Sequence, residues 1–563
     1  MIDRRTLLGG MVAAGTLMGL GGCSFGSAQT NKGADAVPVS WVRYRIGTPA
    51  AIDPLYVADE AGRIVVSQLF DTLLRYDFDT QELTPRVASS YQVSEDAHTI
   101  TFTLVSGATF HNGDPVTSAS FKRAWERLVR PLPAAGEEGA GASDAAEDTA
   151  LYSPSAHLLR HVAGYDALRR AEASELVGLR CPDDQTLVVE LTSAKADWPY
   201  VAAHPALAPI PQAALDDPES FAASPVGNGP FKMKRAWSPK DDVRLTANKA
   251  CALGAPTIEG VLFVTESDTS TAYKQFQAGD IDVCDVPVDQ YEEAEETAGV
   301  AADGRTMEPG ARLIHSDRPA VTYLVCNTSA AGLSQAVIRR ALSQAIDREN
   351  LCEKTLKYSG VPATGPVPPC LAAGDASLWP ACTHDLDAAT GLLDTTHPAD
   401  EAGNRELSLT LLYRKGGVHK RIADQVASDL ALVGCTIQAQ ALEADELDER
   451  YRLGDFELML ATWDPACTSI EAFAYPLLRS GAADGARQSA YVNAELDAVL
   501  DQVDTTVDHT ARRDLCIQAL GMAAEEMPFI PLLYPAHTKV ASARMMHLTI
   551  APDALPDLCV AQK

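Results

Sequence analysis

Basic residues are scarce in this chain. Its 563 residues include 46 Lys and Arg against 76 Asp and Glu, which gives a formal net charge of −30 at pH 7. No long basic stripe offsets this charge, and the phosphate backbone of nucleic acid repels so acidic a surface. Nucleic acid is therefore excluded as a partner. Hydrophobic residues make up 46% and charged residues 22%, an ordinary balance that excludes disorder as the main state.

The motifs of common enzyme classes are also missing. The sequence has no Walker A pattern, no GxSxG elbow and no two cysteines spaced as CxxC. The Gly-Asn-Gly segment at 227–229 is followed by Pro230 instead of a helix start, so we predict a tight turn there and no nucleotide site. His157 and His161 are four residues apart, but the glutamate of a zinc protease is absent beside them. We expect neither an enzyme nor a bound metal or cofactor.

The N-terminal segment lacks charge over a long stretch. Residues 6–31 contain no charged side chain, and the residues before them, 3–5, are Asp-Arg-Arg. A charged start followed by the apolar run 7–20 is typical of a secretory signal, and the run is too short and too rich in glycine for a comfortable membrane span. We predict a signal peptide at residues 1–22. The Arg-Arg pair leaves open whether export follows the general secretory or the twin-arginine route.

The apolar run ends in a motif typical of bacterial lipoproteins. Residues 20–23 read Leu-Gly-Gly-Cys, the pattern of a lipoprotein cleavage box, in which the thiol of Cys23 takes the lipid. We therefore predict lipid attachment at Cys23, which would hold the protein on the membrane. Residues 23–37 are mostly small and polar and are expected to form a flexible tether. Residues 134–150 have no apolar side chain larger than alanine and are predicted to form a disordered insertion.

Eleven cysteines remain after Cys23, an odd number, so at least one thiol stays free or pairs between chains. Cys370 and Cys382 bracket a short loop that contains Gly374 and Pro380. In an oxidising compartment outside the membrane, we expect these two to form a disulfide. The alternative is that the cysteines are small buried hydrophobic residues.

Strand and helix patterns are mixed along the chain without a fixed period, which excludes a solenoid and indicates an α/β class with several lobes. The predicted elements include strands at 41–46 and 529–534, a hairpin at 231–248, and helices at 118–129 after the cap Thr117, at 153–170 and at 269–278.

Short blocks follow one another in a characteristic order over most of the chain. They are Ile52-Asp53-Pro54, Leu69-Phe70-Asp71-Thr72-Leu73-Leu74, Pro85-Arg86-Val87-Ala88, Phe110-His111-Asn112-Gly113-Asp114-Pro115, Pro225-Val226-Gly227-Asn228-Gly229-Pro230-Phe231, Gln277-Ala278-Gly279-Asp280-Ile281-Asp282, Arg339-Arg340-Ala341-Leu342-Ser343-Gln344-Ala345-Ile346-Asp347-Arg348 and Pro528-Phe529-Ile530-Pro531-Leu532. Together with the lipoprotein start, they resemble the extracytoplasmic solute-binding proteins of peptide ABC importers, the oligopeptide/dipeptide-binding family.

The resemblance implies a bilobal α/β fold, type II-like among periplasmic binding proteins, with an extra subdomain and a ligand cleft between the lobes. Lobe I would comprise residues 38–68, 204–309 and 527–563. The extra subdomain II would comprise residues 69–203, and lobe III residues 310–526.

The resemblance also implies the function. By this resemblance the protein would be a monomeric receptor, lipid-anchored outside the cell or in the periplasm. It would capture peptides and deliver them to the permease subunits of an ABC importer. A receptor of the same fold for a nickel complex, haem or a sugar is the alternative. A secreted peptidase is less favoured, because the sequence shows no nucleophile or metal constellation.

The ligand anchor departs from the family's pattern. The family often carries Gly-Trp-x-x-Asp-Tyr, whose aspartate pairs with the α-ammonium of the peptide, and here Ala466 occupies that position. Asp464, two residues earlier, either replaces the missing carboxylate or is only a turn residue before Pro465. The residues expected to contact the ligand are Thr462, Trp463, Asp464, Ala58, Glu60 and Tyr534.

Overall fold

Strands and helices alternate along nearly all of the computed structural model, which describes residues 37–132, 151–239, 241–371, 378–480 and 489–563. The predicted signal peptide, Cys23, nearly all of the predicted tether and the predicted insertion lie outside these residues. Within the described part, no helix combines the length and the apolar character needed to cross a membrane. Met1–Val39 and Ser40–Lys563 are separate units, and the elements below belong to the second.

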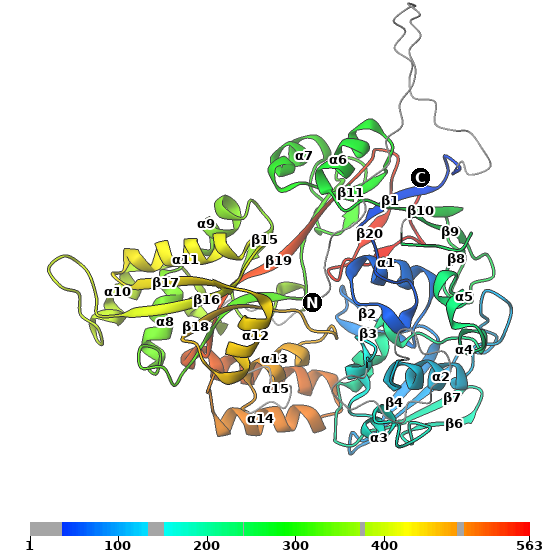
Figure 1. Ribbon diagram of the computed structural model, residues 1–563, viewed down its shortest axis with the longest axis horizontal. Coiled ribbons are helices and arrows are strands. Elements are labelled where there is room, and N and C mark those ends of the chain that lie inside the picture. The colour runs from blue at the N-terminus through cyan, green and yellow to red at the C-terminus, as the bar shows by residue number, and fades with distance from the viewer. Residues whose placement is uncertain (1–36, 133–150, 240, 372–377, 481–488) are drawn as a thin grey trace, which may run out of the picture. The chain divides into compact units, whose positions relative to one another are not determined.

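A twelve-stranded sheet is the main element of this unit (Figure 1). One part, here called the β1 half, contains β1 (Val42–Ile46), β8 (Phe231–Met233), β9 (Val243–Ala247), β10 (Gly260–Thr265), β11 (Val283–Asp285) and β13 (Leu313–Asp317). The other part, the β14 half, contains β14 (Val321–Cys326), β15 (Gly360–Pro362), β16 (Ser408–Arg414), β17 (Thr436–Leu442) and β18 (Leu458–Trp463). Strand β19 (Phe529–Ala541) pairs with strands of both halves.

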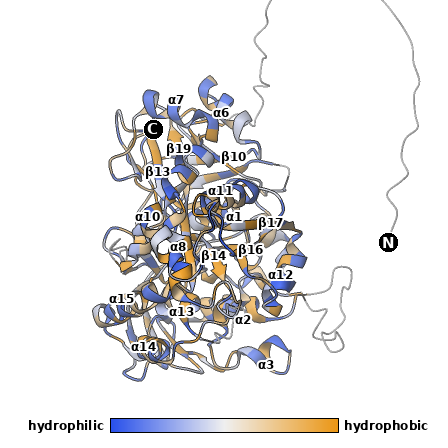
Figure 2. Ribbon diagram, turned by 90° about the vertical axis from the view of Figure 1, so that its left-hand side faces the viewer, coloured by the Kyte–Doolittle hydropathy of each residue, from blue (hydrophilic) through white to orange (hydrophobic). Residues whose placement is uncertain are grey.

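The β1 half is built on an alternating strand. Strand β1 reads Val-Arg-Tyr-Arg-Ile, buries its apolar residues and pairs in parallel with β10 and β11. Helix α6 (Thr269–Ala278) has the predicted bounds, because Asp268 caps its start and Gly279 ends it in the left-handed conformation at φ 83°. Helix α7 is Tyr291–Ala298, and Figure 2 colours both helices mostly hydrophilic.

In the β14 half, strand β14 is buried on both faces of the sheet. Strand β14 is apolar apart from one threonine, and its residues alternate between two hydrophobic clusters. Val321, Tyr323 and Val325 belong to the cluster that includes α13–α15, and Leu324 and Cys326 to the cluster that includes α8, α10 and α11. These helices are α8 (Ala336–Ala345), α10 (Leu386–Asp394), α11 (His419–Leu432), α13 (Glu471–Leu478), α14 (Ala494–Thr505) and α15 (His509–Glu526), and α9 (Arg348–Asn350) and α12 (Ala444–Leu453) complete the set.

Two chain segments pass between the halves. One is β19, the long red strand of Figure 1, which pairs with β14 over residues 529–533 and with β13 over residues 536–540. The other is the link between β13 and β14, where the Arg318 amide donates to the Pro535 carbonyl at 2.7 Å. The two segments are therefore hydrogen-bonded at the point where they cross, and this point is called the crossover below.

A separate four-stranded sheet has the order β4-β5-β7-β6. Its strands are β4 (Ala88–Val93), β5 (Thr99–Leu104), β6 (Leu179–Asp183) and β7 (Thr186–Glu190). The remaining elements are the hairpin β2 (Leu74–Asp77) and β3 (Glu82–Pro85), the three-stranded set β12 (Thr306–Met307), β20 (Leu548–Ile550) and β21 (Pro556–Asp557), and helices α1 (Glu60–Leu69), α2 (Ser118–Val129), α3 (Tyr165–Arg169), α4 (Ala213–Asp216) and α5 (Pro218–Ala223).

The predicted helix at 153–170 is wrong. The segment forms a 3-10 turn at Ala156–Leu159 and then the short helix α3. Gly164 separates them at φ 90°, a conformation that a continuous right-handed helix cannot contain. In contrast, α2 begins after Thr117 as predicted, and the Thr117 amide donates to Ser120 Oγ at 3.2 Å.

The predicted Cys370–Cys382 disulfide is also wrong. All eleven cysteines in the described part of the chain are free thiols. Cys382 is buried among apolar residues of the cluster around Trp379, and this burial raises the pKa of its thiol. The alternative interpretation, a small buried hydrophobic residue, describes Cys382.

Candidate functional site

A pocket of about 80 Å³ lies at the crossover. Its lining comes from segments far apart in the sequence: Arg63 on α1, Arg75 and Tyr76 on β2, residues 200–205, Arg318 and Pro319 in the link between β13 and β14, residues 464–468 after β18, and Asp553 and Leu555 near the C-terminus. The lining therefore combines elements on both sides of the crossover, where a ligand can contact both at once.

Arg318 connects two carboxylates at this pocket. Its guanidinium lies 3.5 Å from Glu60 Oε2 at the start of α1 and 3.7 Å from Asp464 Oδ2 after β18. The Asp464 side chain is 50% exposed, so water screens its attraction to Arg318 and the pair is weak. A ligand cation can therefore compete with Arg318 for either carboxylate at little cost.

The structure places the predicted anchor segment at the pocket. Asp464 and Ala466 both line it. Trp463 is half-buried beside it, and its indole N–H donates to the Ala472 carbonyl at 2.9 Å. Thr462 is exposed, and its hydroxyl lies 2.9 Å from the hydroxyl of Thr322. Thr462 and Trp463 are outside the lining, and so is the predicted contact Glu60, which shares only Arg318 with Asp464.

Two other predicted contacts lie elsewhere. Ala58 is exposed before α1 and is not part of the lining. Tyr534 is fully buried in a hydrophobic cluster, and its hydroxyl donates to the Gly365 carbonyl at 3.0 Å and accepts from the Gly365 amide at 3.1 Å. Tyr534 therefore packs in the core and anchors residue 365, and the expectation that it faces a ligand does not fit its position.

Sequence reasoning missed several residues of the lining. Burial lowers the pKa of His204 to about 3, helped by the nearby charge of Arg63, so this ring is neutral at physiological pH. Burial raises the pKa of Asp553, and the charges of Arg75 and Arg63 oppose that rise. Burial also raises the pKa of the Tyr76 and Tyr200 phenols, whose ring centroids are 6.0 Å apart. No signal in the sequence singles out these residues, because they come from segments far apart in the chain.

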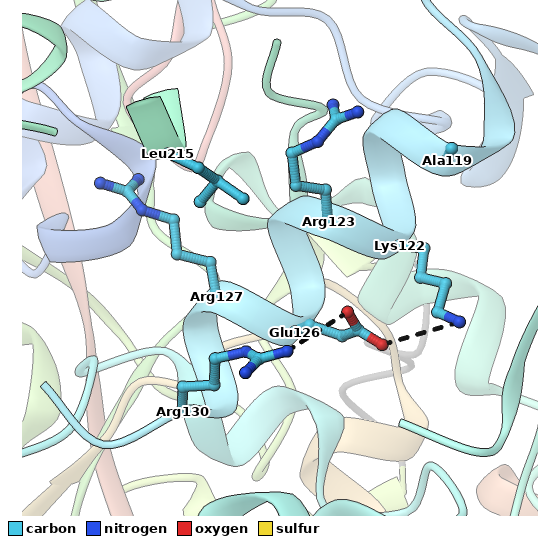
Figure 3. Close-up of a pocket in the computed structure, with 7 residues that line it drawn as sticks. All are labelled: Ala119, Lys122, Arg123, Glu126, Arg127, Arg130 and Leu215. Atoms are coloured by element: carbon cyan, nitrogen blue, oxygen red, sulfur yellow. Dashed lines mark ion pairs between the residues drawn. The ribbon is translucent and has the colours of Figure 1, made fainter. Parts of the chain in front are cut away.

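A second hollow, of about 520 Å³, lies along α2 (Figure 3). Figure 3 shows that its charged side chains are mostly basic: Lys122, Arg123, Arg127 and Arg130, with Glu126 among them. Glu126 pairs with both Lys122 and Arg130 at 3.8 Å. Arg127 is bound by both oxygens of Asp53 at 2.8 Å, and Arg123 donates to the Ile210 carbonyl at 2.7 Å. Lys122 also pairs with Glu175 at 2.6 Å, and Arg130 donates to the Ser174 carbonyl, so all four cations join α2 to its neighbours.

No metal centre emerges from the described residues. Within them, no group of three or more His, Cys, Asp or Glu side chains is arranged to hold a metal ion. The pocket at the crossover instead offers charged groups and aromatic rings, which suit an organic ligand that carries charge.

Comparison with known proteins shows which family the chain resembles. The pattern of the bacterial extracellular solute-binding proteins, family 5 (middle region), matches residues 82–485. The dipeptide-binding protein DppE of Bacillus subtilis is 24% identical over 532 residues, which cover 92% of this chain and 90% of DppE. YgiS of Escherichia coli, named as a probable deoxycholate-binding periplasmic protein, is 25% identical over 500 residues, which cover 86% of each chain.

A solved structure shows the same fold. The unliganded open form of MppA, a periplasmic murein tripeptide binding protein, superposes with a TM-score of 0.77 and 23% identity, over 92% of this chain and 96% of MppA. This likeness confirms the expected α/β fold of periplasmic binding proteins. The family match covers most of the chain, and its members are named for binding solutes outside the cytoplasm. The chain therefore belongs to the bacterial extracellular solute-binding proteins of family 5.

Proposed function

We propose that this protein captures peptides outside the cell and delivers them to an ABC importer. The observation that carries the proposal is the pocket at the crossover, where Arg318 holds Glu60 and Asp464 from different elements. The names of DppE and MppA, a dipeptide-binding and a murein tripeptide binding protein, support a peptide as the ligand.

The proposed capture uses the charges at the crossover. The α-ammonium of a peptide entering the pocket competes with Arg318 for Asp464, which is two residues before the position where Ala466 replaces the family's carboxylate. Because the pocket is lined from both sides of the crossover, a bound ligand favours a conformation in which these sides are close. Hinge closure around the ligand would then present a distinct, loaded surface to the permease.

We also propose that the protein is anchored in the membrane by lipid at Cys23. The support is the Leu-Gly-Gly-Cys pattern after an uncharged apolar run, in a chain whose family is extracellular. Cys23→Ser is expected to release the protein from membranes or to leave the precursor unprocessed. Fractionation and the mass of the N-terminal peptide test this, and a correctly cleaved mutant that stays on the membrane would contradict lipidation.

A second candidate function is capture of a non-peptide solute. The similarity to YgiS, named for deoxycholate, favours this candidate, and a nickel complex, haem or a sugar are further ligands of the same class of receptor. The lining at the crossover carries three arginines and two aspartates, which suit a ligand with charge more than a neutral sugar.

Ligand-induced stabilisation tests the proposal, because a ligand that binds only the folded protein raises its stability by RT ln(1 + [L]/Kd). We suggest thermal unfolding of the purified protein with alanine peptides of two to five residues, with deoxycholate, and with nickel, haem and sugars in parallel. A rise in Tm with at least one peptide is expected. A rise only with a non-peptide solute would replace the proposal with the second candidate, and cleavage of the peptides, checked by mass spectrometry, would indicate a peptidase.

A further inference from the structure

The lining of the pocket at the crossover includes an arginine, Arg63, whose Nε has no hydrogen-bond partner. Arg63 is half-buried on α1, and its Nε is inaccessible to water and has no hydrogen-bond partner. Among the described residues, no carboxylate oxygen lies within 4.0 Å of its guanidinium. An unpartnered buried donor is costly, so proteins rarely keep one unless another molecule satisfies it.

A second cation of this lining is only weakly held. Arg75 lies 4.0 Å from Asp557, and both side chains are about a third or more exposed. Asp553 is near enough for the charges of Arg63 and Arg75 to influence it, but it makes no ion pair within 4.0 Å with either. The two guanidinium groups therefore keep most of their hydrogen-bonding capacity.

His204 adds a neutral donor to the same lining. Its Nδ1 accepts a hydrogen bond from the Ala206 amide at 3.1 Å, so the neutral ring carries its proton on Nε2. Because burial and Arg63 keep this ring uncharged, it adds no repulsion to the two arginines. Two guanidinium forks and one N–H group are therefore offered at this pocket, and the Asp553 carboxylate near them makes no ion pair within 4.0 Å with either arginine.

We propose that Arg63, Arg75 and His204 form a subsite for a carboxylate group of the ligand. A carboxylate accepts two parallel hydrogen bonds from one guanidinium, which is among the strongest polar contacts in proteins. The proposal rests on the proposed function in taking a peptide as the ligand. Its carboxylate comes either from the C-terminus of the peptide or from an acidic side chain.

Two sets of peptide pairs separate these sources. In the first set, alanine peptides of two to five residues are compared as free acid and as C-terminal amide, which tests the C-terminal carboxylate. In the second set, Ala-Glu-Ala amide is compared with Ala-Gln-Ala amide, which tests a side-chain carboxylate. Calorimetry would compare the wild type with Arg63→Gln and with the control Arg452→Gln, which removes an exposed arginine paired with Glu449 on α12.

In at least one of these peptide pairs, the wild type is expected to bind the peptide with the carboxylate at least tenfold more tightly than the peptide without it. A preference for the acids identifies the C-terminus, and a preference for the Glu peptide identifies a side chain. Arg63→Gln is expected to abolish this preference, and Arg452→Gln to keep it. Arg63→Lys keeps the charge but loses the fork, and it is expected to retain only part of the preference.

Equal binding of carboxylate and amide forms by the wild type would overturn the subsite and leave peptide capture intact. A fall in Tm for Arg63→Gln and Arg63→Lys with an unchanged preference would show that Arg63 only supports the fold, and would also overturn the subsite. Failure of the wild type to bind any of these peptides would overturn the proposed function itself, and the subsite with it.

Discussion

Two basic hollows of this acidic protein differ in how their cations are used. Along α2, Lys122, Arg123, Arg127 and Arg130 all bond to other parts of the protein: Lys122 to Glu175, Arg130 to the Ser174 carbonyl, Arg123 to the Ile210 carbonyl and Arg127 to Asp53. Figure 3 shows the further pairs of Lys122 and Arg130 with Glu126 on the same helix. At the crossover, the Nε of Arg63 has no hydrogen-bond partner, and Arg318 is shared between two partly exposed carboxylates, Glu60 and Asp464. Positive charge alone therefore does not mark a ligand site. Charge that is unsatisfied or weakly paired within the protein is a better indicator of a ligand site.

The largest effect is expected at the α2 hollow. Arg127→Ala removes both hydrogen bonds to Asp53, whose side chain is only 1% exposed, and leaves a buried carboxylate without its counter-charge. Breaking such a buried pair costs about 3–5 kcal/mol, so the free energy of unfolding should fall by that amount. Urea unfolding measures it. The control Arg130→Ala, whose side chain is 48% exposed, should cost less than about 1 kcal/mol, and equal losses would break the comparison.

The next effect is expected at the crossover, on affinity. Asp464→Asn keeps the size of the side chain but removes the charge that would meet a peptide's α-ammonium. Binding of a free peptide should weaken by about 2 kcal/mol, roughly thirtyfold, with little change in Tm. N-acetylated peptides should bind the wild type and the mutant about equally in calorimetry. Unchanged affinity of the mutant for the free peptide would show that Asp464 is only a turn residue.

The next effect, of at most about 1.4 kcal/mol for each pH unit, concerns pH. The pKa of His204 is lowered from 6.5 to about 3, so between these values the unfolded chain binds a proton that the folded chain does not. Stability from this residue is therefore complete above pH 6.5 and is lost as the pH falls toward 3, by at most about 1.4 kcal/mol per pH unit. His204→Asn keeps an acceptor for the Ala206 amide and should flatten the pH dependence of urea unfolding over this range. An unchanged slope would show that His204 is not the buried neutral group described here.

The smallest effect is expected for the stability of Arg63→Gln. Because the Nε of Arg63 has no hydrogen-bond partner, its removal should lower the free energy of unfolding by less than about 0.5 kcal/mol, if at all. This near-neutral result, set against Arg127→Ala, would sharpen the contrast between the two hollows. A loss of several kcal/mol in urea unfolding would instead place Arg63 among the residues that support the fold.

The sequence patterns predicted local elements where local chemistry fixes them. Helix α6 was predicted residue for residue, because a capping aspartate and a left-handed glycine bound it. Strand β19 was predicted only to Tyr534, yet it continues to Ala541. Its second part contains His537 and Lys539, and the buried Lys539 is accommodated by an ion pair with Asp285 at 2.6 Å, a partner 254 residues away. Hydrophobic periodicity carries no information about such a partner.

At the candidate site, too, some residues could be predicted from the sequence and others could not. The resemblance to known binding proteins pointed to Asp464 and Glu60, which the structure brings to one arginine. Arg63, His204 and Asp553 could not be grouped in advance, because they meet only after the chain has folded around the crossover. An aromatic residue in a late strand fits a core as well as a cleft, and the burial of Tyr534 and its bonds to Gly365 place its side chain in the core.

Hydrogen–deuterium exchange of the wild type, with and without a bound alanine peptide, tests the central claim most directly. The claim predicts slower exchange at residues 60–64, 200–205 and 464–468, the parts of the chain that meet at the crossover, and no change along α2. Protection confined to residues 118–130, with the crossover unchanged, would contradict it.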